Sequence, residues 1–421
     1  MSETIIRELG GYIPDKTCTI TLDKIKQFVN VPYFIEWYKS GESCKVFPLF
    51  LQELSDLNPV APALFGLITR NPFFDHTMIK YFIAENDQKP VGRITAFIDY
   101  NYSEDKKKTG WVGLFECIKD RKTANMLFDS AVEYLRQNSC QKVIGPAKFN
   151  AGGEIGLLIK GFENMPYFME PYNAPYYQEF FEGYGFEKEN DWYSVSTDEL
   201  LSSDYMNRIA SMNEKFKNNR RNEAFNSFTV RNIDFSNVKK EIGVIRELYN
   251  PIWNEGTHPQ QVYMTEAEFD ALALGIKEIS IEDLIFIVEK DSHPVAVSVN
   301  LPDINEVINE YDSIRKNFVP KNSFRAIPDI IRDLKIFLRI KRRIKEKKFS
   351  RTRFLILGIH KEYRKNGIDT MLYSLIKKKA LEFGITHGSA SQMADINMDI
   401  INPIFKLGKI ALTWRAYKLD I

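Results

Sequence analysis

The sequence predicts an α/β protein made of two domains, and three observations lead to this prediction. The chain has 421 residues, of which 44% are hydrophobic, so it can bury two cores of roughly 200 residues each. An apolar run of strand length, a cationic turn and a helical pattern follow one another at 353–384. A weaker copy of the same order lies at 110–137, in the first half of the chain.

Composition and charge narrow the class of protein. The chain carries 57 basic and 56 acidic residues, and a net charge of +1 favours neither nucleic acid nor a membrane as a general partner. The four cysteines show no C-x-x-C spacing, which argues against a zinc site and against a disulfide framework. The sequence has no leader-like start and no run of about 18 uncharged apolar residues, so we expect a cytoplasmic protein.

Common catalytic and nucleotide-binding motifs are missing from the sequence. It has no P-loop, no dinucleotide-binding glycine pattern, no H-E-x-x-H and no G-x-S-x-G. No metal site is predicted, because the five histidines lie far apart in the chain: His76, His258, His293, His360 and His387. The glycine-rich segment at 151–156 opens no clear helix and is expected to form a tight loop.

The segment 353–384 predicts an anion site. "RFLILGI" at 353–359 has the pattern of a strand buried on both faces, and apolar residues then recur at helical spacing over 368–383. A helix start offers unpaired backbone N–H groups and about half a positive charge. Gly367 would let a phosphate approach the backbone, and Arg364 and Lys365 add charge, although a solvated turn would fit the same residues.

The same residues carry a family resemblance. "LGIHKEYRKNGIDTMLY" at 357–373 resembles the acyl-CoA-binding signature of the GNAT acyltransferase superfamily, R/Q-x-x-G-x-G/A. The resemblance implies that this segment holds the pyrophosphate of acetyl-CoA or another acyl-CoA. The implied cofactor-binding residues are Leu357, Ile359, Arg364, Lys365, Asn366, Gly367, Ile368, Asp369, Thr370 and Asn397. Asp369 departs from the signature, and a carboxylate there repels pyrophosphate unless it points away.

A second signature of the superfamily is matched further along. "SASQMADINMDIINPIFKLG" at 389–408 resembles the segment in which an asparagine, here Asn397, contacts CoA. Many members place a tyrosine that serves as general acid seven residues after that asparagine, where this chain has Ile404. Tyr373, Tyr417 or water must then return a proton to the departing thiolate.

The remaining elements of the second half follow the order of a GNAT domain. Strand patterns occur at 228–233, 284–290 and 293–303, and helical patterns at 238–249 and 265–277. An insertion at about 310–350 follows, and its later part, 332–351, carries ten basic residues against two acidic ones. It predicts a basic amphipathic helix that packs by its apolar side. The alternative is peripheral contact with a membrane or an acidic partner through 330–348.

The first half is a degenerate version of the second. Aligning Met126 with Met371 places Lys122 where the second half has Gly367, so we expect CoA to bind the second half only. Phrases such as "NPFFDH", "GPAKFN" and "LPDIN" are similar to those of a bacterial group of tandem-GNAT proteins. This resemblance implies two GNAT-like domains, each with a mixed central sheet flanked by helices. The predicted domains are 1–200, degenerate, and 201–421, acyl-CoA-binding, with a polar boundary near 197–204.

The resemblance implies an acyl-CoA-dependent N-acyltransferase, with acetyl as the expected acyl group and an unidentified small-molecule or peptide amine as acceptor. Asp303 and Asn305 would orient or deprotonate that amine, although a strand-end turn explains them equally well. Trp253 would wall the acceptor pocket, unless it is a core residue. Two other classes stay open: a non-catalytic CoA-binding scaffold and an aminoacyl transferase that uses charged tRNA. No specific nucleic-acid binding is expected, and the oligomeric state is not predicted.

Overall fold

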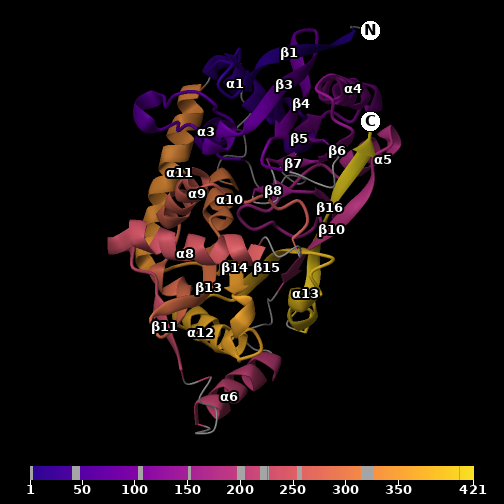
Figure 1. The fold of residues 1–421 in the computed structure, drawn as a ribbon. Coiled ribbons are helices and arrows are strands. Elements are labelled where there is room, and N and C mark those ends of the chain that lie inside the picture. Colours follow the sequence, from indigo (N-terminus) through magenta and orange to yellow (C-terminus); the bar gives the residue numbers. More distant parts are fainter. Residues whose placement is uncertain are drawn as a thin grey trace.

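The computed structural model describes residues 3–39, 48–102, 108–149, 153–196, 204–218, 225, 227–253, 258–313, 326–406 and 408–421. A single sheet of 14 strands runs through the molecule (Figure 1). Its strands, in spatial order, are β11 (Phe228–Asn232), β12 (Ile285–Lys290), β13 (His293–Pro302), β14 (Arg351–Ile359), β15 (His387–Ala394), β10 (Glu187–Ser196), β16 (Lys409–Asp420), β6 (Lys142–Gly145), β5 (Thr109–Cys117), β4 (Lys89–Asp99), β3 (Thr77–Asn86), β1 (Thr4–Ile13) and β2 (Thr17–Cys18). Beside this row, β9 (Leu157–Lys160) pairs with β16, and β7 (Ala147–Lys148) pairs with β8 (Glu154–Ile155).

Helices connect the strands in a similar order in the two halves. The first half contains α1 (Leu22–Val29), α2 (Glu36–Lys39), α3 (Phe50–Asp56), α4 (Arg121–Gln137) and α5 (Tyr177–Tyr184). The second contains α6 (Asp204–Asn218), α8 (Val238–Trp253), α9 (Glu266–Glu278), α10 (Asn305–Ser313), α11 (Ala326–Glu346), α12 (Ile368–Phe383) and α13 (Met398–Ile404). Short 3-10 turns are η1 (Val31–Phe34), η2 (Leu64–Gly66), η3 (Pro72–Asp75), η4 (Phe235–Asn237), η5 (Glu282–Leu284) and η6 (Lys361–Tyr363). No helix in the described ranges is long and apolar enough to span a bilayer.

The duplication predicted from the sequence is visible in the sheet. Strands β1, β3, β4 and β5 form an antiparallel row that ends on the parallel strand β6, and β11, β12, β13 and β14 end likewise on β15. Helix α4 connects β5 to β6, and α12 connects β14 to β15. Each unit is a mixed sheet flanked by helices, so the predicted fold class is confirmed.

The two halves exchange their last strands. Strand β10, from the first half, pairs with β15 of the second, and β16 pairs with β6 of the first. The exchanged strands also pair with each other, which makes the sheet continuous. The segment 197–203, where the sequence predicts the domain boundary, lies outside the described residues. A boundary drawn along the chain therefore differs from the grouping of strands in space.

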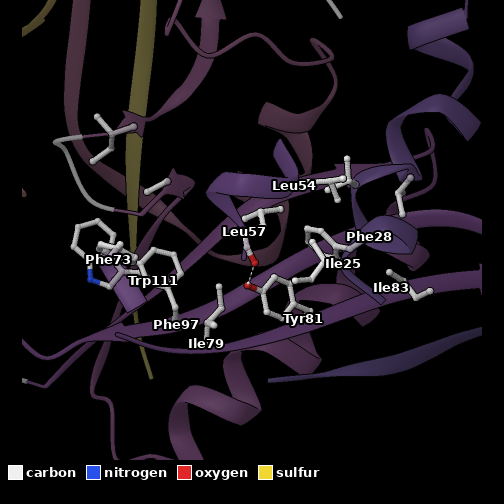
Figure 2. Packing of buried hydrophobic residues seen from close by; sticks show 14 of the residues in the cluster. Ile25, Phe28, Leu54, Leu57, Phe73, Ile79, Tyr81, Ile83, Phe97 and Trp111 are labelled. Carbon is white, nitrogen blue, oxygen red and sulfur yellow. Dashed lines mark hydrogen bonds between the residues drawn. The ribbon is translucent and has the colours of Figure 1, made fainter. Parts of the chain in front are cut away.

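Both faces of the sheet bury apolar side chains. Side chains alternate between faces along a strand, so Ile285 and Ile287 of β12 pack with α8 and α9 while Phe286 and Val288 pack with α12. In the first half, Phe97 stacks on Trp111 with ring centroids 5.9 Å apart. Figure 2 shows this cluster, in which the Tyr81 hydroxyl donates to the Leu57 carbonyl at 3.0 Å. The same cluster includes Ala394, Leu412 and Trp414, so the halves share a core.

Local signals explain several helix ends. Thr265 and Glu268 form a capping box at the start of α9, and Gly384 ends α12 with a left-handed φ of 70°. Strand β14 departs from the prediction, since its middle residues 354–357 are only half-buried. These residues line a cavity instead of packing on both sides.

Candidate functional site

A cavity opens where β14 and β15 separate. The two parallel strands pair only from Arg351 to Phe354 on β14, whereas the other edge of β15 stays paired with β10 as far as Ala394. The opening holds a cavity of about 160 Å³. Its aliphatic and aromatic lining residues are Met169, Trp192, Tyr249, Trp253, Leu272, Ile276, Phe354, Leu355, Ile356, Leu357, Tyr373, Ile376, Ala390, Met393, Ala394, Ile400 and Ile404. The polar ones include His258, Gln261, Ser298, Asn300, Arg353, Ser391, Gln392 and Asn397.

Trp253 and His258 form one wall of this cavity. The indole packs across Gly358 of β14, where a Cβ atom would lie 2.7 Å from the ring, so only glycine permits this approach. His258 stacks on Trp253 with ring centroids 5.3 Å apart. Its Nε2 atom lies 3.3 Å from the Nδ2 atom of Asn397. An amide nitrogen can only donate, so this contact fits a neutral imidazole whose Nε2 carries no proton.

Arg353 provides a fixed positive charge at the inner end. Its Nε donates to the Ser391 hydroxyl at 3.0 Å, and Nη1 donates to the Phe168 carbonyl at 2.7 Å. The Ser391 hydroxyl in turn donates to the Glu170 carboxylate. Burial lowers the pKa of Arg353, and the charge of Glu170 opposes this effect. The network satisfies these polar groups and leaves the remainder of the cavity mainly apolar.

The predicted anion-binding turn lies directly after β14. Gly367 adopts a left-handed φ of 80° and begins α12, while Lys365 also has a positive φ of 66°. Arg364 donates from Nε to the carbonyl of Ile359 at 3.1 Å, which ties the turn to the strand end. The first N–H groups of α12 have no partner within the helix and face a ligand or water. Asp369 is exposed, which keeps its carboxylate hydrated.

No family model matches the chain. The chain is 33% identical over 248 residues to protein YghO of Escherichia coli K12, covering 58% of this chain and 60% of YghO, which is less than two thirds of that relative. It is 27% identical over 289 residues to the bacterial ceramide synthase of Caulobacter vibrioides, covering 68% and 69%. A tandem GNAT protein from the clavulanic acid biosynthesis pathway superposes with a TM-score of 0.51, at 9% identity, over 99% of this chain and 98% of that one.

The chain has a tandem GNAT fold. The resemblance drawn from the two sequence signatures is therefore confirmed at the level of the fold. The predicted residues Trp253, Leu357, Tyr373 and Asn397 all line the cavity, although they come from three different elements and the turn before α13. Ile404, which stands where the superfamily's tyrosine is expected, lines it too. Their roles remain predictions.

Three predicted catalytic or acceptor-binding residues, Asp303, Asn305 and Tyr417, lie outside both this cavity and the Gly367 turn. Asp303 is fully buried, accepts from Arg351 at 2.7 Å and from the Phe168 N–H at 3.0 Å, and burial raises its pKa to about 6. Asn305 donates to the carbonyl of Pro166 at 3.1 Å. Tyr417 is buried on β16 and donates to Glu182 at 3.1 Å. All three side chains connect the two halves of the tandem GNAT fold, so we leave them out of the proposed machinery.

His258 is a cavity residue that the sequence did not single out. The five histidines lie far apart in the chain, and Asn397 is 139 residues away from His258. The local signal was its position five residues after Trp253, which was already a candidate for the pocket wall.

The first half of the tandem GNAT fold fills its equivalent opening with its own side chains. Beyond the pairing of β5 with β6, the N–H of Cys117 donates to the Tyr177 hydroxyl at 2.9 Å, and the Tyr176 hydroxyl donates to the Cys117 carbonyl at 2.8 Å. At the start of α4, the Asp120 carboxylate accepts from the Thr123 N–H at 2.9 Å. A carboxylate of the chain thus occupies the place that an anion takes at a free helix start.

Proposed function

We propose that this protein is an N-acyltransferase that moves an acyl group from acyl-CoA to a primary amine in the cavity between β14 and β15. The observation that supports this proposal most directly is that the cavity and the Gly367 turn belong to one strand–turn–helix unit. The pyrophosphate would lie on the start of α12, beside Arg364 and Lys365. The acyl arm would follow β14 from Ile359 toward Leu357, whose neighbouring backbone N–H groups are suited to polarise the thioester carbonyl.

The acid–base chemistry follows from the cavity wall. The amine nitrogen attacks the thioester carbonyl, the C–N bond forms and the C–S bond breaks. His258 takes the proton that the nitrogen loses on Nε2, after the Asn397 amide that donates to this atom has turned away from its lone pair. The departing thiolate regains a proton from the Tyr373 hydroxyl or from water. Arg353 takes no part in these reaction steps, because its N–H groups already donate to Ser391 and Phe168.

The chemical class of the acceptor is suggested by the apolar lining. A ceramide is an amide formed on the amino group of a long-chain amino alcohol, and one relative of the chain is named a bacterial ceramide synthase. Apolar side chains such as Leu272, Ile276 and Ile400 suit a hydrocarbon chain better than a polyamine or an amino sugar. We therefore place a long-chain amino alcohol first among acceptors, and a fatty acyl group ahead of acetyl.

An acceptor and donor matrix tests this proposal. The full chain is incubated with acyl-CoA of two to sixteen carbons against sphinganine, polyamines, amino sugars and peptides. Release of free thiol and mass spectrometry of the amide are followed. The expected result is an amide with a long-chain amino alcohol, strongest with a long acyl chain. If an amide formed only from acetyl-CoA and a small amine, the proposed substrates would be refuted, but the proposed acyl-transfer reaction would stand.

A non-catalytic CoA-binding protein is the second candidate. The observation in its favour is the aliphatic side chain of Ile404 in the cavity, where superfamily members carry the general acid. This candidate predicts stoichiometric CoA binding with no thiol release from any amine in the matrix. Binding of charged tRNA without CoA would instead favour the aminoacyl transferase class.

A further inference from the structure

Helix α11 is held in place by its inner face. Ile336 and Ile340 are buried in the core of the second half. Arg332 is buried and donates from Nε to Asp312 of α10 at 2.9 Å, and Asp333 accepts from the Leu51 N–H of α3 at 2.8 Å. Figure 1 shows the helix standing along one side of the molecule beside α3 and α10. These contacts fix which side of α11 faces outward.

The outer face begins with an aliphatic stripe. Ile327, Ile331, Leu334 and Leu338 lie at spacings of four, three and four residues, which places them on one line along the helix. Their exposed fractions are 70%, 44%, 38% and 67%. Phe337, on the flank, is 39% exposed. We call the four aliphatic residues the α11 stripe, which the described residues leave between 38% and 70% exposed.

Basic side chains continue and flank the α11 stripe. Lys341, Arg342 and Lys345 follow it on the same side of the helix, with Lys335 and Arg339 beside it. Lys335 and Lys345 form no ion pair within the described ranges.

Two of the three acids of α11 lie on the inner side, and the third is paired with a base of the outer side. Asp329 and Asp333 are buried on the inner side, and Glu346 accepts from Arg342 at 2.9 Å. The outward surface therefore combines aliphatic and cationic groups.

We propose that the α11 stripe and its cations dock this protein on an anionic lipid surface, with the helix lying in the plane of the membrane. A helix of 21 residues is about 30 Å long, and its four aliphatic side chains would enter the boundary between headgroups and acyl chains. Lysine and arginine side chains are long enough to reach lipid phosphates from beside that boundary. This docking goes beyond the proposed function, because it does not depend on the identity of the acceptor.

A lipid surface fits this face better than a protein groove. A groove in a partner protein would cover the aliphatic side chains and desolvate the neighbouring cations, whereas a membrane takes up the first and keeps the second hydrated at the headgroups. Each basic residue near an anionic surface contributes about 1 kcal/mol, or about fivefold in affinity. The α11 stripe alone gives the salt-independent part of the binding.

Co-sedimentation with vesicles tests the docking. The full chain is mixed with vesicles of phosphatidylcholine containing 30% phosphatidylserine, or of phosphatidylcholine alone, at low and high salt. We expect binding to the anionic vesicles that falls steeply with salt. Ile331→Ser with Leu338→Ser should weaken it more than tenfold, and Lys335→Glu with Lys345→Glu should weaken it and flatten the salt dependence. Leu381→Ser, at a residue 58% exposed on α12, is the matched control and should bind normally.

Each outcome decides the proposal. The substituted residues are exposed, so we expect the variants to fold like the parent chain. An unchanged melting temperature will confirm this. No binding of the parent chain to anionic vesicles at low salt would overturn the docking, and so would equal binding by the stripe variant and the control. Equal binding to neutral and anionic vesicles would overturn the electrostatic part. Acyl-transfer activity with soluble substrates should not change in the stripe variant, which separates this test from that of the proposed function.

Discussion

Replacing Gly367 by valine should abolish CoA binding while leaving the protein folded. Gly367 has a φ of 80° at the start of α12, a conformation that costs an L-residue about 2 kcal/mol and is worst for a β-branched one. The valine side chain would also stand between the pyrophosphate and the first N–H groups of the helix. Each lost hydrogen bond to a charged group is worth about 1.5–3 kcal/mol. Losing two of them would weaken binding by about a hundredfold to about ten-thousandfold.

Gly384→Val provides the matched control. Gly384 ends the same helix with a φ of 70°, and a Cβ atom there would meet no other atom within 4 Å. The two substitutions should therefore cause a similar loss of stability, about 2 kcal/mol in chemical denaturation. Only Gly367→Val should lose the ligand. Titration calorimetry should give one CoA per chain for the parent protein, and Lys122→Ala should leave this result unchanged.

Two results would refute this reasoning. If Gly384→Val lost CoA as completely as Gly367→Val, the loss would reflect general destabilisation and not the anion site. If a folded Gly367→Val variant bound CoA normally, the turn would be a solvated connection and the ligand would lie elsewhere. A stoichiometry of two would show that the tyrosine-filled opening of the first half can still admit a ligand.

Other predictions concern the cavity and the buried charges. His258→Gln should lower kcat by about a hundredfold or more with little change in the KM for acyl-CoA, and a normal kcat would remove it as the base. Asp303→Ala should cost about 3 kcal/mol of stability, since it leaves Arg351 unpaired, yet keep kcat within a few-fold below the melting temperature. Burial raises the pKa of Glu116 to about 7, so its folded form binds more protons than the unfolded chain. Stability should therefore fall as pH rises from about 4.5 to about 7, and Glu116→Gln should reduce that slope in denaturation at fixed pH. Burial lowers the pKa of His76, but the Asp99 and Glu268 carboxylates outweigh this effect and raise the pKa to about 10. The stability that its charge provides should be lost between about pH 6.5 and about pH 10, and His76→Gln should show no loss in that window.

Features set by neighbouring residues were predictable from the sequence. The helix over 368–383, the glycine at each of its ends and the strand before it all follow from local patterns, and the structure has them within two residues. The duplication was visible because both copies keep the strand–turn–helix order. Asn397 could be placed because its segment matched a signature of fixed spacing.

Features set by distant residues were not predictable. The strand-end turn containing Asp303 gave no sign of its ion pair with Arg351, 48 residues later, or of the Phe168 N–H, 135 residues earlier. His258 becomes a candidate base only because the fold places it beside Asn397 in the cavity. The exchange of β10 and β16 is equally non-local, because an antiparallel strand has the same alternation of side chains whichever neighbour it pairs with.

The exchanged strands also constrain how the protein is made. Strand β16 completes the sheet of the first half. Its residue Ala411 accepts a hydrogen bond at the carbonyl from the side-chain amide of Asn164, which lies 247 residues earlier in the chain. While the chain grows on a ribosome, the first half must wait with the edge of β6 unpaired until the second half has been translated. A stop codon between the halves would leave that edge open to other chains. Synthesis of the first half alone should therefore yield aggregates. A second half supplied as a separate polypeptide should prevent this aggregation only if its β16 pairs with β6 of the first half.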